Sequence, residues 1–243
     1  MSLAIAVVGL ASWAGVSSGT GTHRPGNQHP GTITRTTTKP DPTTTTTAPN
    51  LRSSKVSVWS QTFTDPTGAV LPTQVFYPVT SSGVPVPGAH PLIVFAEGFD
   101  ALPGYYSDLL DAWAKAGFVV AAPIFPGTSG STAPGQLNEN DDLRQPAEVN
   151  FVISSLLSLN GSAGNLLYNL LDPSSIGLAG HSDGGDTVSA VSYNPCCYSS
   201  RIGATAILSG TELPGVAPGS YFTSPNPSPL LVVQGQADTI NPP

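Results

Sequence analysis

The chain has 243 residues, of which 39% are hydrophobic and 9% are charged, so it can form one sizeable globular domain and is not disordered throughout. Its formal net charge is −7, and the residues from Val56 onward carry three basic side chains against fourteen acidic ones. A domain this acidic is not expected to bind nucleic acid or an anionic membrane surface non-specifically.

Residues 1–16 are expected to form a signal-peptide-like apolar segment. Leu3–Val16 is uncharged and too short to span a bilayer comfortably. It resembles the hydrophobic region of a secretory signal, with Ser12-Trp13-Ala14 as a small-x-small cleavage site, although no basic residue precedes it. The alternative is a buried strand or helix of the domain. The signal interpretation predicts a secreted or cell-surface bacterial protein with no stable membrane span in its mature form.

Residues 17–54 are expected to be a disordered linker. They are rich in Thr, Pro and Gly and contain almost no large apolar side chain, so they cannot offset the entropy cost of ordering. Such a tract suits O-glycosylation or the spanning of a cell wall, which makes association with the wall a further expectation.

The folded domain is expected to cover residues 55–243, which alternate between short apolar runs and helical periodicity. The expected strands are Val56–Phe63, Thr73–Tyr77, Pro91–Ala96, Phe118–Pro123, Ile176–Ala179, Ala204–Ser209 and Leu230–Gly235. The expected helices are Tyr106–Ala116 and Pro146–Leu159, with a further helix after Ser182 and a loop over Ile124–Asp142. This order predicts an α/β fold with a mostly parallel sheet, helices on both faces and two antiparallel strands at its N-terminal edge.

The segment Gly180-His181-Ser182-Asp183-Gly184 carries the chemistry that this fold could support. It matches G-x-S-x-G, with a strand-like approach and a helix-compatible exit. A serine at the tip of such a turn is strained, and side chains two residues before and after it would collide, so Gly180 and Gly184 suit the turn. Ser182 is therefore predicted to be a nucleophile, and the backbone N–H of Asp183 to be an oxyanion-hole donor.

With this motif the chain resembles the α/β-hydrolase superfamily. Within it, the chain is similar to secreted bacterial esterases of the dienelactone-hydrolase-like, platelet-activating-factor-acetylhydrolase-like and chlorophyllase-like group, which borders the cutinases. The similar segments run from Thr62 to Pro243 and include Phe76-Tyr77-Pro78, which resembles a strand end common in that group.

The resemblance implies the remaining residues of a catalytic site. The strand Leu230–Gly235 followed by Asp238 resembles the family's strand and acid loop, which makes Asp238 the expected triad acid. The family usually has His-Gly-aromatic after the strand Pro91–Ala96, where this chain has Glu97-Gly98-Phe99, so the N–H of Phe99 is the expected second oxyanion donor. Glu97 in place of His puts the hydrogen bonding of that loop in question.

A catalytic histidine is not found in the position that the resemblance requires, since none follows Asp238. His181 is expected to be a packing residue, and His90 to lie at the wrong end of its strand. His23 and His29 fall in the linker. We therefore expect the chain to be truncated at its C-terminus, with the base in the missing part.

The adjacent Cys196 and Cys197 are the only cysteines, and the sequence leaves three states open for them: a vicinal disulfide, a bridge to another chain, or two thiols. No metal site or other cofactor is implied.

Three functional hypotheses remain. The first is a secreted serine hydrolase that cleaves short acyl, lipid or polymer esters through an acyl-enzyme. The second is an inactive hydrolase-fold protein that binds a ligand or the cell wall. The third keeps the triad but changes the substrate to a peptide or a lactone, because the motif does not report the substrate.

Overall fold

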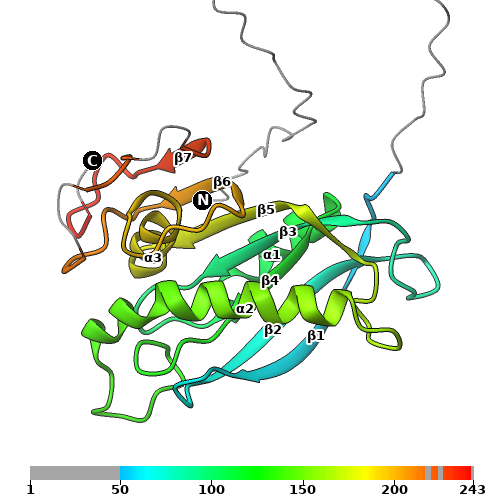
Figure 1. Cartoon of the computed structure of the whole chain (residues 1–243), viewed down its shortest axis with the longest axis horizontal. Coiled ribbons are helices and arrows are strands. Elements are labelled where there is room, and N and C mark those ends of the chain that lie inside the picture. The colour runs from blue at the N-terminus through cyan, green and yellow to red at the C-terminus, as the bar shows by residue number, and fades with distance from the viewer. Residues whose placement is uncertain (1–49, 217–219, 224–226, 242–243) are drawn as a thin grey trace, which may run out of the picture. The chain divides into compact units, whose positions relative to one another are not determined.

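Seven strands form one sheet in the order β1-β2-β4-β3-β5-β6-β7 (Figure 1). The computed structural model describes residues 50–216, 220–223 and 227–241, so the signal-like segment and nearly all of the expected linker lie outside the described residues. The strands are β1 (Lys55–Thr64), β2 (Val70–Val79), β3 (His90–Ala96), β4 (Val119–Pro123), β5 (Leu171–His181), β6 (Ile202–Leu208) and β7 (Leu230–Val233).

The sheet confirms the predicted mixture of strand directions. β2 is antiparallel to both β1 and β4, whereas the pairs β3–β4, β3–β5, β5–β6 and β6–β7 are parallel. The turn between β1 and β2 is held by the Asp65 carboxylate, which accepts hydrogen bonds from the N–H groups of Thr67 and Ala69. The carboxyl ends of the parallel strands therefore share one edge, which is where α/β proteins place their sites.

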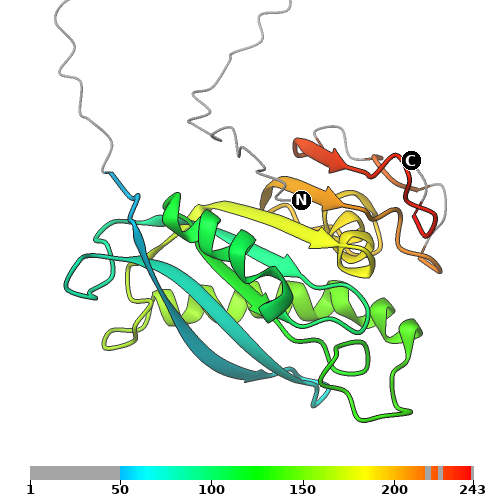
Figure 2. The same cartoon turned by 180° about the vertical axis from the view of Figure 1, so that it is seen from behind.

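Helices cover both faces of the sheet. The helix α1 (Ser107–Lys115) lies on one face, and α2 (Gln145–Asn160) and α3 (Asp183–Tyr193) lie on the other, as the front and rear views show (Figures 1 and 2). Each face has its own buried apolar cluster. The larger one, beneath α2 and α3, includes Leu92, Val152 and Leu178, and the smaller one, beneath α1, includes Phe95, Leu110 and Trp113.

The predicted helices are present, and short 3-10 helices precede them. The helix expected over Tyr106–Ala116 is α1, which is one residue shorter at each end, and it follows a 3-10 turn, η1 (Pro103–Tyr106), that begins at Pro103. The segment Ile124–Asp142 is not loop throughout, because a second 3-10 helix, η2 (Glu139–Arg144), begins at Glu139. The side chain of Asn138 caps η2 by accepting a hydrogen bond from the N–H of Asn140.

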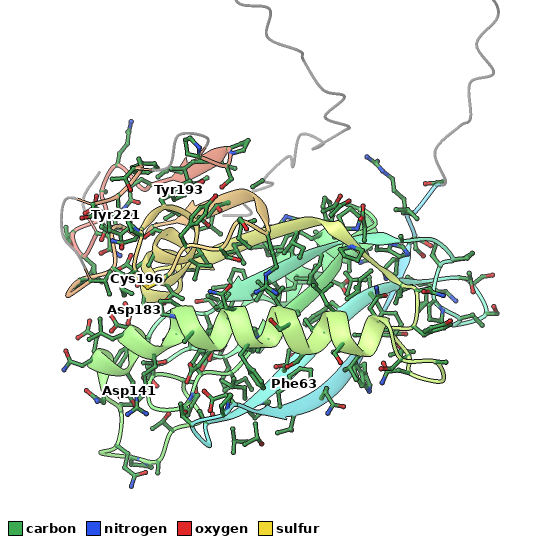
Figure 3. The ribbon with its side chains drawn as sticks, viewed as in Figure 1. Phe63, Asp141, Asp183, Tyr193, Cys196 and Tyr221 are labelled. Carbon is green, nitrogen blue, oxygen red and sulfur yellow. A yellow bond between two sulfur atoms is a disulfide. The ribbon has the colours of Figure 1, made fainter. Side chains whose placement is uncertain are left out.

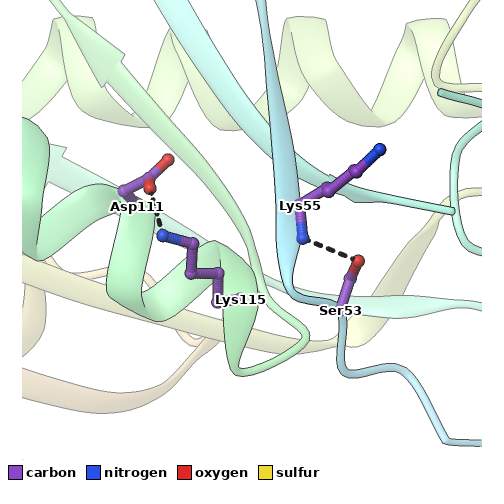
Figure 4. A network of polar contacts seen from close by, with 4 residues as sticks. All are labelled: Ser53, Lys55, Asp111 and Lys115. Carbon is purple, nitrogen blue, oxygen red and sulfur yellow. Dashed lines mark hydrogen bonds and ion pairs between the residues drawn. The ribbon is translucent and has the colours of Figure 1, made fainter. Parts of the chain in front are cut away.

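The residues just before β1 are hydrogen-bonded to the folded domain. The N–H of Ser53 donates to the carbonyl oxygen of Lys115 at 3.1 Å, and the Ser53 hydroxyl accepts from the N–H of Lys55. Figure 4 shows the hydrogen bond between Lys55 and Ser53 and, beside it, the ion pair between Lys115 and Asp111. The charged atoms of this ion pair are 2.8 Å apart at the end of α1. Ordered contacts therefore include the last residues of the segment that we expected to be linker.

In the described part of the chain, no helix combines the length and apolar character needed to cross a bilayer.

Candidate active site

Ser182 lies at a sharp turn between β5 and α3. Its φ is 52° and its ψ is −127°, a conformation that non-glycine residues rarely adopt. The turn is fixed from both sides. The N–H of Ser182 donates to the carbonyl oxygen of Leu208 in β6, and the Ser182 carbonyl oxygen accepts from the N–H groups of Gly185 and Asp186. Such an over-determined, strained backbone is typical of a functional residue.

The two glycines of the motif are required by close backbone contacts. A Cβ atom on Gly180 would lie 2.0 Å from the carbonyl oxygen of Gly184. A Cβ atom on Gly184 would lie 2.2 Å from the carbonyl oxygen of Ala96, at the end of β3. Only glycine allows α3 to start this close to β3 and β5, as the sequence argument anticipated.

The loop after β3 lies directly against this turn. A Cβ atom on Gly98 would be 3.2 Å from the Cβ of Ser182 and 3.2 Å from Nδ1 of His181, so the backbone of Gly98 packs on both residues. The next residue, Phe99, has 38% of its surface exposed. The loop is closed by Asp100, whose φ is 54° and whose N–H donates to the carbonyl oxygen of Thr128. The structure therefore brings Phe99, Ser182 and Asp183 to one edge of the sheet.

Glu97, which precedes this loop, is buried in the domain. Its side chain is 2% exposed, and one carboxyl oxygen accepts from the N–H of Phe125 at 3.4 Å. The other carboxyl oxygen, Oε2, is buried without a hydrogen-bond partner. Burial raises the pKa of Glu97 to about 8, and the Phe125 N–H opposes this only in part. Glu97 is therefore a neutral carboxylic acid at pH 7.

Asp238 is held in the turn that follows β7. Its Oδ1 accepts from the N–H groups of Ile240 and Asn241, each at 3.0 Å, and Gln234 donates to Oδ2. The N–H of Asn241 and then that of Ile240 lower the pKa of the carboxyl group, so Asp238 is ionised. The side-chain amide of Asn241 donates to the carbonyl oxygen of Ser209, which immediately follows β6. The acid loop is thus anchored one strand away from Ser182, on the same edge of the sheet.

The two histidines of the described region have different environments. His90 is fully buried at the start of β3, and its ring nitrogens lie 2.7 Å and 2.8 Å from the carbonyl oxygens of Gly117 and Val86. It therefore lies at the far end of its strand from Ser182, as predicted. His181 is half-buried, and its Nδ1 is 3.0 Å from the hydroxyl oxygen of Tyr106. Nothing in the sequence marks Tyr106 as a site residue, because it belongs to no motif and is 75 positions from His181.

Acidic side chains surround the start of α3. Burial raises the pKa of Asp142 and of Asp186 to about 6, and the charge of Asp183 adds to both shifts. Burial also raises the pKa of Asp183 itself, and Glu139 contributes. Figure 3 shows Asp183 and Asp141 at the same end of the domain. Among the described residues, no group of three or more His, Cys, Asp and Glu side chains could hold a metal ion.

A disulfide joins Cys196 and Cys197, so the first of the three states left open by the sequence is the observed one. It lies just after α3, next to a cavity of about 320 Å³ lined by residues of α2 and by Tyr198. Figure 3 labels Cys196 at the same end of the domain as Asp183.

This combination of a mostly parallel sheet, a strained serine turn after the fifth strand and an acid after the last described strand defines an α/β-hydrolase. A family model described as "Chlorophyllase" matches residues 60–217. The chain therefore belongs to the chlorophyllase family, as the resemblance read from its motifs anticipated.

One solved structure supports this fold. A ferulic acid esterase from Streptomyces cinnamoneus is similar with a TM-score of 0.52 and 20% identity, over 77% of this chain and 66% of that one. The structure of DcsB in complex with its substrate analogue gives a TM-score of 0.48 and 16% identity, over 63% of this chain and 45% of that one. This chain thus spans no more than about two thirds of either protein. No curated protein matches the sequence.

Proposed function

We propose that the protein is a serine hydrolase that cleaves carboxylic esters through an acyl-enzyme. The observation that carries this proposal is the strained turn at Ser182, packed against the backbone of Gly98. Membership of the chlorophyllase family and the likeness to an esterase fold support it. Short acyl, lipid and polymer esters remain the proposed substrate class.

The proposed mechanism uses the geometry of the turn. The Ser182 hydroxyl attacks the ester carbonyl carbon as a base takes its proton, and the oxyanion accepts hydrogen bonds from the N–H groups of Asp183 and Phe99. Collapse of this intermediate expels the alcohol, which takes a proton from the protonated base. Water then repeats the sequence on the acyl-enzyme and regenerates Ser182.

We propose that the base is a histidine from outside the 243 residues, oriented by Asp238. His90 lies at the opposite end of β3, and Nδ1 of His181 faces Tyr106. β7 supports this idea. Leu231 and Val232 are 56% and 52% exposed, whereas a strand inside a parallel sheet is normally covered on both faces. A further segment that covers β7 would lie beside the Asp238 loop.

We also propose that the protein is exported by a bacterium to the cell surface or beyond. The disulfide between Cys196 and Cys197 supports this, because disulfides persist mainly in oxidising compartments. The acidic domain gives no reason to propose a nucleic-acid partner.

The test uses protein expressed from the full reading frame. We expect Ser182→Ala to lower the hydrolysis of p-nitrophenyl butyrate at least about a thousandfold, and Asp238→Asn to lower it by about 10² to 10⁴. Ser60→Ala, an exposed serine on β1, is the matched control and should not change the rate. A fluorophosphonate probe should label Ser182. An undiminished rate in Ser182→Ala would refute the nucleophile, and a full reading frame without a further essential histidine would refute the proposed base.

A further inference from the structure

The hydroxyl group of Tyr106 connects the two parts of the candidate site. Tyr106 is the last residue of η1, and its hydroxyl oxygen accepts a hydrogen bond from the N–H of Gly98 at 3.2 Å. The same oxygen lies 3.0 Å from Nδ1 of His181, the residue before the nucleophile. One hydroxyl group therefore contacts both the loop that carries Phe99 and the turn that carries Ser182.

The N–H of Gly98 can only donate, so the Tyr106 hydroxyl oxygen accepts that hydrogen bond. The hydroxyl group has one proton, and we assign it to the hydrogen bond with Nδ1 of His181, which lies 3.0 Å away. In this assignment Nδ1 is an acceptor, and neutral His181 has its proton on Nε2. Burial lowers the pKa of His181, against the opposing charge of Asp238, and so favours the neutral ring.

Packing holds the Tyr106 ring in place. The ring centroid lies 4.7 Å from that of Phe95 in β3 and 5.6 Å from that of His181. The Phe95 ring in turn packs against the ring of Trp113 in α1, with the two ring centroids 6.1 Å apart, within the smaller apolar cluster. The hydroxyl group therefore projects from a rigid base, and its position is set by the sheet and α1 rather than by the loop that it contacts.

We propose that Tyr106 is a positioning residue, which holds the oxyanion loop against the nucleophile turn through Gly98 and His181. Only the two backbone dihedral angles of Gly98 separate its N–H from the N–H of Phe99, so anchoring the first N–H limits how far the second can move. Gly98 already packs against the Cβ of Ser182, and a small displacement of the loop would move the Phe99 N–H away from the oxyanion. This inference rests on the proposed ester hydrolysis by Ser182.

A positioning role of this kind acts on the transition state more than on substrate binding. The oxyanion forms only after attack, so a misplaced donor lowers kcat while KM stays the same. Removal of a whole oxyanion donor costs about 10² to 10³ in kcat, and a donor that is loosened should cost about tenfold to a hundredfold.

The experiment compares Tyr106→Phe with Tyr105→Phe in protein expressed from the full reading frame. Tyr106→Phe keeps the ring that packs on Phe95 and removes only the hydroxyl group. Tyr105 is the adjacent residue in η1 and is 73% exposed, so its variant is a matched control. We would measure kcat and KM with p-nitrophenyl butyrate, and the tautomer of His181 by long-range ¹H–¹⁵N NMR, assigned with His181→Gln.

The wild-type protein should show His181 with its proton on Nε2, and Tyr106→Phe should show a mixture of tautomers. The same variant should lose about tenfold to a hundredfold in kcat with an unchanged KM, and Tyr105→Phe should match the wild type in both measurements. An active wild type with unchanged kcat in Tyr106→Phe would overturn the positioning role. An unchanged tautomer would overturn the hydrogen-bond assignment. A wild type without esterase activity would overturn the proposed function, and with it the positioning role, whatever the tautomer.

Discussion

The buried carboxyl group of Glu97 should make the stability of the domain depend on pH. Its pKa rises from 4.5 to about 8 because the side chain is buried and Oε2 has no hydrogen-bond partner. The folded state therefore keeps the proton over a pH range in which the unfolded state has lost it. The stabilisation of the protonated group is complete below about pH 4.5 and is lost as the pH rises towards 8.

The size of the effect follows from one proton. On account of Glu97, the free energy of unfolding should fall by at most about 1.4 kcal/mol per pH unit, and by about 4 kcal/mol in total between pH 5 and pH 9. Glu97→Gln replaces the neutral acid by a neutral amide of the same shape. It retains an oxygen that can accept from the Phe125 N–H and has no proton to lose.

Urea denaturation of wild type and Glu97→Gln between pH 5 and pH 9 would test this. The two proteins should be similar at pH 5, and the variant should become the more stable one as the pH rises. Glu212→Gln, at an exposed glutamate, is the control and should follow the wild type at every pH. A stability difference between wild type and Glu97→Gln that does not change with pH would refute the argument that the buried carboxyl group titrates.

Three further predictions concern other parts of the site. Gly184→Ala should destabilise the domain by about 3 kcal/mol in urea denaturation, because its Cβ would overlap the backbone of β3, whereas Gly161→Ala, at an open helix end, should cost less than about 1 kcal/mol. Serine at both Cys196 and Cys197 should lower the stability by only about 1 kcal/mol by the same measurement, since the disulfide closes a very short loop. Asp183→Asn removes a carboxylate next to Ser182, so an anionic substrate should be repelled less. At low salt, the ratio of kcat/KM for anionic p-nitrophenyl hemisuccinate to that for neutral p-nitrophenyl butyrate should rise by about tenfold. An unchanged ratio would contradict this prediction.

The parts of the site that depend on local sequence could be predicted. Gly180 and Gly184 are needed by a turn only five residues long, and both glycines are part of the G-x-S-x-G motif, so the motif alone predicts where they are required. The strands β3 and β5, which lead to Gly98 and Ser182, are buried at their carboxyl ends, and their apolar runs are recognisable for that reason. The largest difference in strand length is at β5, which begins at Leu171 rather than Ile176 because Leu171 already pairs with His90.

The parts that depend on tertiary contacts could not be predicted. Tyr106 reaches His181 from a turn 75 residues away, and a tyrosine at the start of an amphipathic helix is not distinguishable by sequence from any other apolar position. The raised pKa of Asp142 likewise comes from its burial beside Asp183, two side chains brought together only when η2 packs against α3. The disulfide between Cys196 and Cys197 could be predicted only in part, because two adjacent cysteines can form such a bond but need not do so.

Glu97 departs from the pattern of the resembling enzymes, but its side chain can still be neutral at this position. The usual histidine of the resembling enzymes and the glutamate of this chain differ in charge when exposed. Burial raises the pKa of Glu97 to about 8, so its side chain is neutral at pH 7 and adds no negative charge beside the proposed oxyanion. Above pH 8 that charge would appear behind the loop that carries the Phe99 N–H. Loss of the Glu97 proton should then oppose oxyanion formation and folding together, which links the alkaline limit of activity to the alkaline limit of stability.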